Sequence, residues 1–170
     1  MKLGYLGPRT NSEKAVRALN IKFEPIAFGS MEEVVEALNM GMVERAVIPV
    51  RNSFRGDIKK HIAWIEENNF RVVEEVTIPV VHSLGYLGRE IGFILSHIEA
   101  LGQCADYLNR RFGEVYREAV KSTEVAARFV SELGIGAAIA PLETCRHYKL
   151  NILDEDIVKG NESTFHVCAK

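Results

Sequence analysis

Hydroxyl, amide and glycine residues gather in six short polar segments, most of them at an expected turn between a strand and a helix. The segments read GYLGPRTNSEKA (4–15), VIPVRNSFRG (47–56), SHIEALGQCADYL (96–108), KSTEVAAR (121–128), AAIAPLETCRHYKL (137–150) and NESTF (161–165). The first, second and fourth segments place these residues where a helix begins. A helix N-terminus offers backbone N–H groups without intrahelical partners and a partial positive charge, and both suit anions. Together the segments indicate a site for a small, acidic, organic molecule held between secondary-structure elements.

The elements that must position these segments alternate between strands and helices. β-Branched and aromatic content predicts strands at 2–6, 22–28, 45–50, 71–81, 91–95, 115–120, 136–140, 152–157 and 164–169. Helices are expected at 11–20, 31–40, 57–68, 97–111, 123–133 and 142–149. Three helix starts carry a hydroxyl followed three residues later by glutamate, namely Thr10–Glu13, Ser30–Glu33 and Ser96–Glu99. The alternation predicts an α/β fold with a largely parallel sheet.

The extended stretch from Arg71 to Leu87 predicts a division into two lobes. It is too long for one strand of a small sheet, and its character changes around Pro79. We therefore expect this stretch to leave one lobe and enter another, and the C-terminal part of the chain to cross back. The expected lobes are 1–79 with 154–170 and 80–153. A small ligand would then bind in the cleft between the two lobes.

Composition excludes several classes of protein. The chain has 170 residues, of which 47% are hydrophobic and 26% charged, as in ordinary globular proteins. Its net charge of −2 gives no sign of a surface for nucleic acid or anionic membranes. No apolar run approaches the ~18 residues of a membrane span or follows a basic start, so we expect a cytoplasmic protein. Cys104, Cys145 and Cys168 show no metal-ligand spacing and predict buried or incidental thiols, with no metal site.

In this order and at roughly these separations, the six segments resemble the catalytic domain of prephenate dehydratase. The family pattern runs approximately GYLGPxGTFSxxA, VPxENSxxG, SHPQALxQCxxYL, STxxAA, AAIASxxAAxxYGLxxL and NxTRF. The most specific matches are GYLGP, P-V-x-N-S-x-x-G, S-H-x-x-A-L-x-Q-C-x-x-Y-L and S-T-x-x-A-A. The resemblance covers essentially the whole chain. It implies an α/β, two-lobed fold similar to type II periplasmic binding proteins, with the ligand between the lobes.

The resemblance also implies an activity and a set of partners. Members of the family are lyases of phenylalanine biosynthesis that convert prephenate (or arogenate, in some members) with loss of carbon dioxide and a hydroxyl. Aromatisation supplies much of the driving force, so we expect neither a metal nor an organic cofactor. The expected ligand is a small prephenate-like carboxylate and the expected assembly a homodimer, without nucleic acid or membrane partners. Neither an ACT regulatory domain nor a chorismate mutase domain is expected in this sequence.

Site residues follow from the resemblance, residue by residue. Ser163 takes the place of the threonine that the family is thought to use in catalysis. The other residues at the site positions of the family pattern are predicted to bind substrate, namely Thr10, Ser12, Arg51, Asn52, Ser53, Ser122, Thr123, Thr164 and Phe165. For the hydroxyls at helix starts, simple helix capping remains an alternative.

The sequence departs from the family pattern at polar positions of the site. NESTF stands for NxTRF, so Ser163 replaces threonine and Thr164 replaces an arginine whose bidentate fork threonine cannot mimic. Arg51 replaces the glutamate of ENS. In one interpretation Arg51 takes over carboxylate binding and the protein is still a dehydratase. In the other, the lost residues formed an essential pair, and the protein is a diverged binder of another small carboxylate, acting as a sensor, regulatory subunit or related enzyme.

Overall fold

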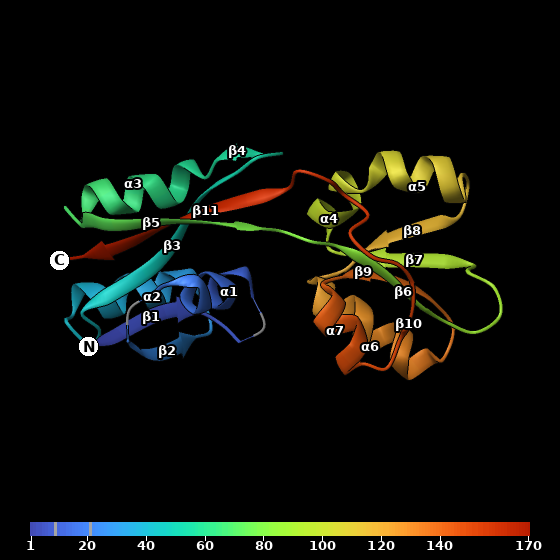
Figure 1. Ribbon diagram of the computed structural model, residues 1–170, viewed down its shortest axis with the longest axis horizontal. Helices are drawn as coiled ribbons and strands as arrows, with labels where there is room; N and C mark the ends of the chain where they lie inside the picture. The colour runs from blue at the N-terminus through green and yellow to red at the C-terminus, as the bar shows by residue number, and fades with distance from the viewer. Residues whose placement is uncertain (9, 21) are drawn as a thin grey trace. The chain divides into compact units, whose positions relative to one another are not determined.

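The computed structural model describes residues 1–8, 10–20 and 22–170, so residue 9 of the first polar segment and residue 21 lie outside the described part. The described residues fold into two compact units. Unit 1 comprises Met1–Val80 and Gly160–Lys170, and unit 2 comprises Val81–Lys159. Both chain termini therefore belong to unit 1 (Figure 1).

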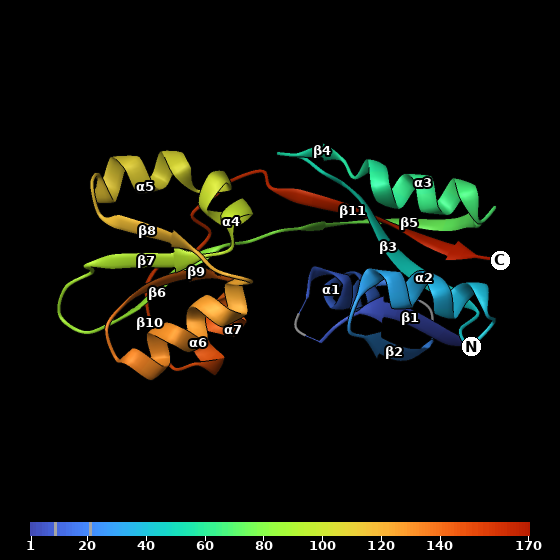
Figure 2. The ribbon, with the colours of Figure 1, turned by 180° about the vertical axis from the view of Figure 1, so that it is seen from behind.

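A mixed sheet forms the centre of unit 1. Its strands are β1 (Lys2–Leu6), β2 (Glu24–Phe28), β3 (Arg45–Asn52), β4 (Gly56–Asp57), β5 (Arg71–Pro79) and β11 (Glu162–Ala169). The order is β2–β1–β3–β11–β5, with β4 paired to the end of β3. β1 is parallel to β2 and β3, whereas β11 is antiparallel to β3 and β5. β11 thus lies between β3 and β5, and the last strand completes a sheet begun by the first (Figures 1 and 2).

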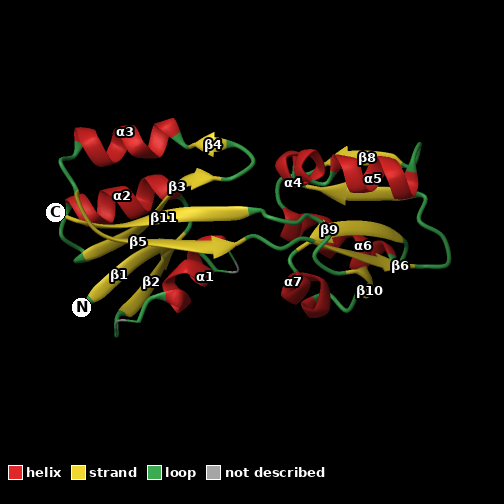
Figure 3. Ribbon diagram, turned by 45° about the horizontal axis from the view of Figure 1, so that its top comes forward, coloured by secondary structure: helices red, strands yellow, loops and turns green. Residues whose placement is uncertain are grey.

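Helices cover both faces of this sheet because successive side chains of a strand point to opposite faces. The helices are α1 (Asn11–Ala18), α2 (Met31–Asn39) and α3 (Lys59–Glu67). On β3, Val47 packs in the cluster that contains residues of α1. Its neighbours Ala46 and Ile48 pack in the cluster with residues of α2 and α3. In Figure 3, α2 and α3 accordingly lie on the same side of the sheet.

Unit 2 repeats this three-layer plan around a second mixed sheet. Its strands are β6 (Ser83–Leu87), β7 (Phe93–Ser96), β8 (Tyr116–Ala119), β9 (Gly136–Ala140) and β10 (Asn151–Asp154), in the order β10–β6–β9–β7–β8. β7 is parallel to β8 and β9, whereas β6 is antiparallel to β9 and β10. The helices are α4 (Ile98–Gln103), α5 (Ala105–Phe112), α6 (Thr123–Leu133) and α7 (Leu142–His147).

The buried strand β9 separates the two helical layers of unit 2. Ala137 and Ile139 pack with residues of α4 and α5, and Ala138 and Ala140 pack with residues of α6 and α7. Figure 1 shows these helix pairs on opposite sides of the sheet. No helix among the described residues combines the length and the apolar character that crossing a lipid bilayer requires.

The α/β class is confirmed, and each expected element from 2–6 to 164–169 has a counterpart close to its predicted range. The prediction of a largely parallel sheet was wrong, because β5 and β6, which carry the chain out of unit 1, run antiparallel to their neighbours. β11, which carries the chain back, is antiparallel as well. Each sheet is therefore mixed.

The prediction that a hydroxyl caps the helix is confirmed at two of the three helix starts. Thr10 and Ser30 accept hydrogen bonds from the N–H groups of Glu13 and Glu33, at 3.3 and 3.2 Å. Ser96 does not cap a helix. Its Oγ donates to the backbone oxygen of Ile139 (2.7 Å). The helix begins one residue later, with His97 as its N-cap, and the expected helix 97–111 is divided at Cys104 into α4 and α5.

The return of the chain to unit 1 lies later than expected. The sequence predicted a boundary at 153/154, whereas unit 2 continues to Lys159. β10 pairs with β6, and Val158 is buried in the core of unit 2, so this segment belongs there. The predicted ligand cleft between the lobes stays a prediction.

Candidate functional site

The polar segments of unit 1 meet at one edge of its sheet. β1 and β3 are parallel, so their carboxyl ends point to the same edge, and β11, antiparallel to β3, begins there. Thr10 lies in the segment after β1. Asn52 is the last residue of β3, and Ser53 follows it directly. Ser163 is the second residue of β11 and pairs with Asn52. Ligands of open α/β sheets bind outside the carboxyl ends of the strands. The topology thus brings four of the sequence-predicted site residues to an edge suited to ligands.

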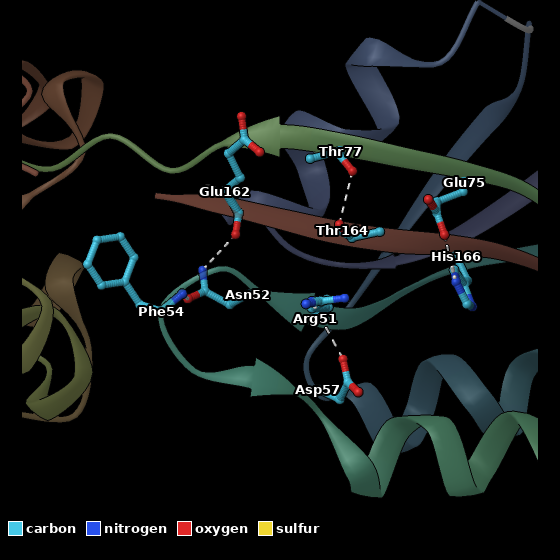
Figure 4. Close-up of polar contacts among 9 residues, drawn as sticks. All are labelled: Arg51, Asn52, Phe54, Asp57, Glu75, Thr77, Glu162, Thr164 and His166. Carbon is cyan, nitrogen blue, oxygen red and sulfur yellow. Dashed lines mark hydrogen bonds and ion pairs between the residues drawn. The ribbon is translucent and has the colours of Figure 1, made fainter. Parts of the chain in front are cut away.

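Asn52 forms hydrogen bonds through both ends of its side-chain amide (Figure 4). Its Oδ1 accepts from the backbone N–H of Phe54 at 3.0 Å. Its Nδ2 lies 2.9 Å from Oδ1 of Asn161, 3.0 Å from the backbone oxygen of Glu162 and 3.0 Å from Oγ of Ser163. Because the oxygen only accepts and the NH2 group only donates, the N–H of Phe54 determines which end of the amide faces β11.

Ser163 lies directly opposite Asn52 in the pairing of β3 with β11 and is half-buried. Its Oγ accepts a hydrogen bond from Nδ2 of Asn52, so its own proton is directed to another acceptor. Hydrogen bonds in a chain polarise one another, and this strengthens the hydroxyl as a donor. The arrangement therefore presents Ser163 as a neutral hydrogen-bond donor at the carboxyl edge of the sheet.

Ser53 fastens the turn after β3 to the start of β11. Its Oγ donates to the backbone oxygen of Gly160 (3.0 Å) and accepts from the N–H of Glu162 (2.9 Å). Its own N–H donates to the backbone oxygen of Glu162 (2.9 Å). Through these bonds the Ser53 hydroxyl stabilises the contact between the turn after β3 and the start of β11. Its role in binding substrate stays a prediction.

Arg51 and Thr164 occupy one position of the β3–β11 register, where they lie directly opposite each other. Because side chains alternate along a strand, both point to the face opposite to that of Asn52. Nε of Arg51 lies 3.7 Å from Oδ1 of Asp57, and Oγ1 of Thr164 lies 2.9 Å from Oγ1 of Thr77 (Figure 4). The two departures that change a charge, Arg51 and Thr164, are therefore cross-strand neighbours, each with a partner on an adjacent strand.

Four of the predicted hydroxyls stand at helix N-termini. Thr10 caps α1 by accepting from the N–H three residues on (3.3 Å), and Ser122 caps α6 in the same way (3.1 Å). Ser12 is buried in the first turn of α1, and Thr123 is the first residue of α6. Thr10 and Ser12 belong to unit 1 and the other two to unit 2. Capping is thus established for Thr10 and Ser122, while substrate binding stays a prediction for all four.

Phe165 lies inside the core of unit 1. Its side chain is 2% exposed and packs in the cluster that contains Leu3, Val47 and Val167. This placement makes Phe165 a packing residue that holds β11 against the sheet.

Asn161 was not among the predicted site residues, although it is only 3% exposed and its side chain contacts Asn52. The available signal was its position as the first residue of the NESTF segment. In unit 2, buried His82 has its Nε2 2.8 Å from Oε1 of Gln103, a residue of the third polar segment. Among residues 1–8, 10–20 and 22–170, no group of three or more His, Cys, Asp or Glu side chains could hold a metal ion.

Comparison with protein families finds a model described as prephenate dehydratase that matches residues 3–170. The prephenate dehydratase of Lactococcus lactis subsp. cremoris (strain MG1363) is 32% identical over 178 residues, which cover 100% of this chain and 64% of that protein. The prephenate dehydratase of Bacillus subtilis (strain 168) is 36% identical over 169 residues, which cover 92% of this chain and 59% of that protein. The chain thus spans roughly three-fifths of the length of these relatives.

Among solved structures, the prephenate dehydratase of Arthrobacter aurescens in complex with L-Phe superposes with a TM-score of 0.83. The similarity covers 100% of this chain and 60% of that one, at 23% sequence identity. At this level of identity the likeness shows a shared fold. The relative itself binds a small amino acid, L-Phe.

Proposed function

This chain belongs to the prephenate dehydratase family, and we propose on that premise that it converts prephenate to phenylpyruvate with loss of water and carbon dioxide. The observation that carries the proposal is the match of the family model to residues 3–170. The hydroxyl–amide pair of Ser163 and Asn52 supports it, because this pair offers a fixed donor at the carboxyl edge of a sheet.

The reaction sets clear demands on such a donor. The C–O bond to the ring hydroxyl and the C–C bond to the ring carboxylate break, and the electron pair of the C–C bond completes the aromatic ring. Negative charge develops on the departing oxygen, which leaves as water after it gains a proton. A donor that is oriented before the reaction stabilises this charge without reorganisation. We assign this role to Ser163, whose hydroxyl already accepts from Asn52 and can donate to the leaving oxygen.

The two substrate carboxylates require other donors. Helix N-termini can bind a carboxylate, because their backbone N–H groups and the helix dipole favour anions. On this ground we propose Thr10 and Ser12 at the start of α1, and separately Ser122 and Thr123 at the start of α6, as carboxylate-binding residues. Arg51 and Thr164 have less support as substrate ligands, because they lie on the face of the sheet opposite to Ser163. The proposed ligand is a prephenate-like carboxylate, and the proposed homodimer is tested by light scattering.

A second candidate function is the binding of a small carboxylate without dehydration. The observation that favours it is the pair of departures at Arg51 and Thr164, which remove a carboxylate-binding guanidinium from β11. In that case the edge around Asn52 and Ser163 would bind an acid without assisting the loss of a hydroxyl.

A combined activity and binding experiment distinguishes the candidates. Purified protein is incubated with prephenate, and phenylpyruvate is followed by its ultraviolet absorbance, with arogenate and phenylalanine formation as a parallel assay. Thermal shifts are measured with both acids and with a set of other small carboxylates. Turnover supports the dehydratase, and a thermal shift without turnover supports the binding protein. The Ser163→Ala variant, purified in the same way from a host that lacks its own dehydratase, controls for contaminating enzyme.

A further inference from the structure

We propose that Asn161 is a positioning residue, which acts through Asn52 to keep the hydroxyl of Ser163 in the orientation of a donor. The inference rests on the proposed function of Ser163 and names a residue that the family resemblance did not assign. It is argued from three side chains in contact: Oδ1 of Asn161 accepts from Nδ2 of Asn52 at 2.9 Å, and the same Nδ2 lies 3.0 Å from Oγ of Ser163.

The Asn52 amide has two hydrogens on Nδ2 and more acceptors around it than hydrogens. Three acceptors lie within 3.0 Å of Nδ2, on Asn161, Glu162 and Ser163, so one hydrogen is shared. Asn161 offers the nearest of the three, and a bond to it fixes one N–H direction. Because the amide group is planar, the second N–H direction is then fixed as well. That direction serves the acceptors on β11, including the serine hydroxyl.

Asn161 also restricts rotation of the Asn52 amide. The N–H of Phe54 holds the oxygen end of the Asn52 amide. With this contact alone, the amide could still rotate about its oxygen end. Asn161 anchors the opposite, nitrogen end. With both ends held, the amide cannot turn its oxygen toward Ser163, which would make the hydroxyl donate to Asn52 and remove its proton from the substrate. Asn161 thus helps to decide whether Ser163 accepts from Asn52 or donates to it.

This role of Asn161 is separate from folding. The backbone around Asn161 is held by contacts that do not involve its side chain. Its carbonyl oxygen accepts from the N–H of Val80 at 2.8 Å, and Ser53 bonds to the backbone of both adjoining residues, Gly160 and Glu162. The start of β11 therefore keeps its position when the Asn161 side chain is shortened, and Asn52 loses the acceptor that holds its nitrogen end.

The experiment compares Asn161→Ala with Asn161→Asp, which keeps an oxygen acceptor in place. We expect Asn161→Ala to lower kcat about 10- to 100-fold with KM changed less than about twofold, the scale of a misplaced catalytic group. Asn161→Asp is expected to recover most of this loss. The matched control is Asn68→Ala, which removes the acceptor of another amide–amide bond in unit 1, the one from Asn39. The control should leave kcat and KM unchanged.

A double-variant cycle distinguishes positioning from a structural effect. If Asn161 acts through the Ser163 hydroxyl, Asn161→Ala should change kcat less than about twofold in a Ser163→Ala background. An equal loss in both backgrounds would overturn the proposal, as would a rise in KM at unchanged kcat. Where Asn161→Ala does not fold, Asn161→Ser, whose side chain is too short to reach Asn52, carries the same expectation.

A measurement without turnover separates failure of this inference from failure of the proposed function. In the nuclear magnetic resonance spectrum, the Asn52 side-chain amide protons should exchange slowly with solvent in the natural protein and at least tenfold faster in Asn161→Ala. A natural protein without dehydratase activity would contradict the proposed function, while the exchange rates would still decide whether Asn161 holds Asn52. Equal exchange in both proteins would overturn the positioning role.

Discussion

An amide that is hydrogen-bonded at both ends can hold a neighbouring hydroxyl in one orientation, and Asn52 is arranged to do this for Ser163. Serine needs such help more than threonine does. The γ-methyl of threonine restricts rotation about χ1, and serine lacks that restriction. The contact from Asn52 can therefore supply orientation that the methyl group would otherwise give. At this scale, the replacement of threonine by serine is compatible with catalysis.

The first prediction concerns the Ser163 hydroxyl. Removal of one preorganised donor to a developing oxyanion typically lowers kcat by ~10²–10³. Ser163→Ala should show a loss of that size, with KM and melting temperature nearly unchanged. Ser163→Thr should keep or raise activity, because the added methyl group stiffens the side chain. Steady-state kinetics and thermal melts measure both effects. Ser131→Ala is the control, because it makes the same serine-to-alanine change on α6 outside the proposed site and should leave kcat unchanged. A fully active Ser163→Ala would remove Ser163 from the mechanism.

The second prediction concerns Arg51. The sequence suggested that Arg51 binds a substrate carboxylate, and its loss would then weaken affinity by about 2 kcal/mol. Its guanidinium instead lies 3.7 Å from Asp57, with both side chains largely exposed, on the face opposite to Ser163. We expect Arg51→Ala to change stability by less than about 1 kcal/mol, as for exposed ion pairs, and to leave KM nearly unchanged.

Asp57→Ala is the control for Arg51, because it breaks the same ion pair and keeps the guanidinium. Chemical denaturation and KM are measured for both variants. A loss of affinity near 2 kcal/mol in Arg51→Ala, absent from Asp57→Ala, would show that Arg51 binds the ligand after all.

At the scale of elements, the sequence predicted where strands and helices lie better than how they pair. An alternating or buried strand has the same pattern in both directions, so nothing in β5 or β11 indicated their antiparallel pairing. The break between α4 and α5 was hidden for a related reason. Ala100, Cys104 and Leu108 are all buried in one core cluster, so the helical period continues across the break.

The same limit applies to the site. Asn52 and Ser163 could be selected from the sequence, because the family pattern contains the asparagine and has another hydroxyl residue, threonine, at the position of the serine. The contact of Asn52 with Asn161 could not, because it joins residues 109 positions apart and depends on the register of β3 with β11. Likewise, the position of Arg51 directly opposite Thr164 follows from that register and from no local signal.

The third prediction tests the N-terminus of α6, where Ser122 is the cap. Ser122→Ala should cost about 1 kcal/mol of stability, because one backbone N–H loses its partner. Ser122→Asp should keep the stability, since aspartate caps equally well and suits the helix dipole. If a substrate carboxylate binds here, the added negative charge of Ser122→Asp should raise KM at least tenfold.

Ser30→Asp is the matched control, because Ser30 caps α2 in the same way. It should alter neither the melting temperature nor KM appreciably. An unchanged KM in Ser122→Asp would mean that Ser122 is a cap and takes no part in binding.

At the scale of the whole molecule, a buried thiol lies in the core of each unit. Cys168 is buried in unit 1, and Cys104 and Cys145 are buried in unit 2. Burial disfavours the thiolate and raises the pKa of Cys104 and Cys168 to about 12, and that of Cys145 to about 11. These thiols keep their protons in the folded chain at pH values where the unfolded chain loses them. The free energy of unfolding in alkali therefore depends on the burial of thiols in both units.

The last prediction is the direction of this pH dependence. A group with a raised pKa in the folded state stabilises it fully below the ordinary pKa, here 9.0, and this stability is lost as pH rises from there toward 11 or 12. Each such thiol should lower the free energy of unfolding by about 1.4 kcal/mol per pH unit within that window. Since domains are stable by about 5–15 kcal/mol, the combined effect of the three thiols is comparable in size with the stability of a whole domain.

Urea denaturation at pH 7 to 11 measures the effect. We expect a constant free energy of unfolding up to about pH 8.5 and a steep fall above it. The matched control replaces Cys104, Cys145 and Cys168 together by alanine. That variant should be less stable at pH 7, because each alanine leaves a small cavity, but its free energy should fall less steeply above pH 9. Equal slopes in the two proteins would show that the thiols ionise alike in the folded and unfolded chains, contrary to their burial in the two cores.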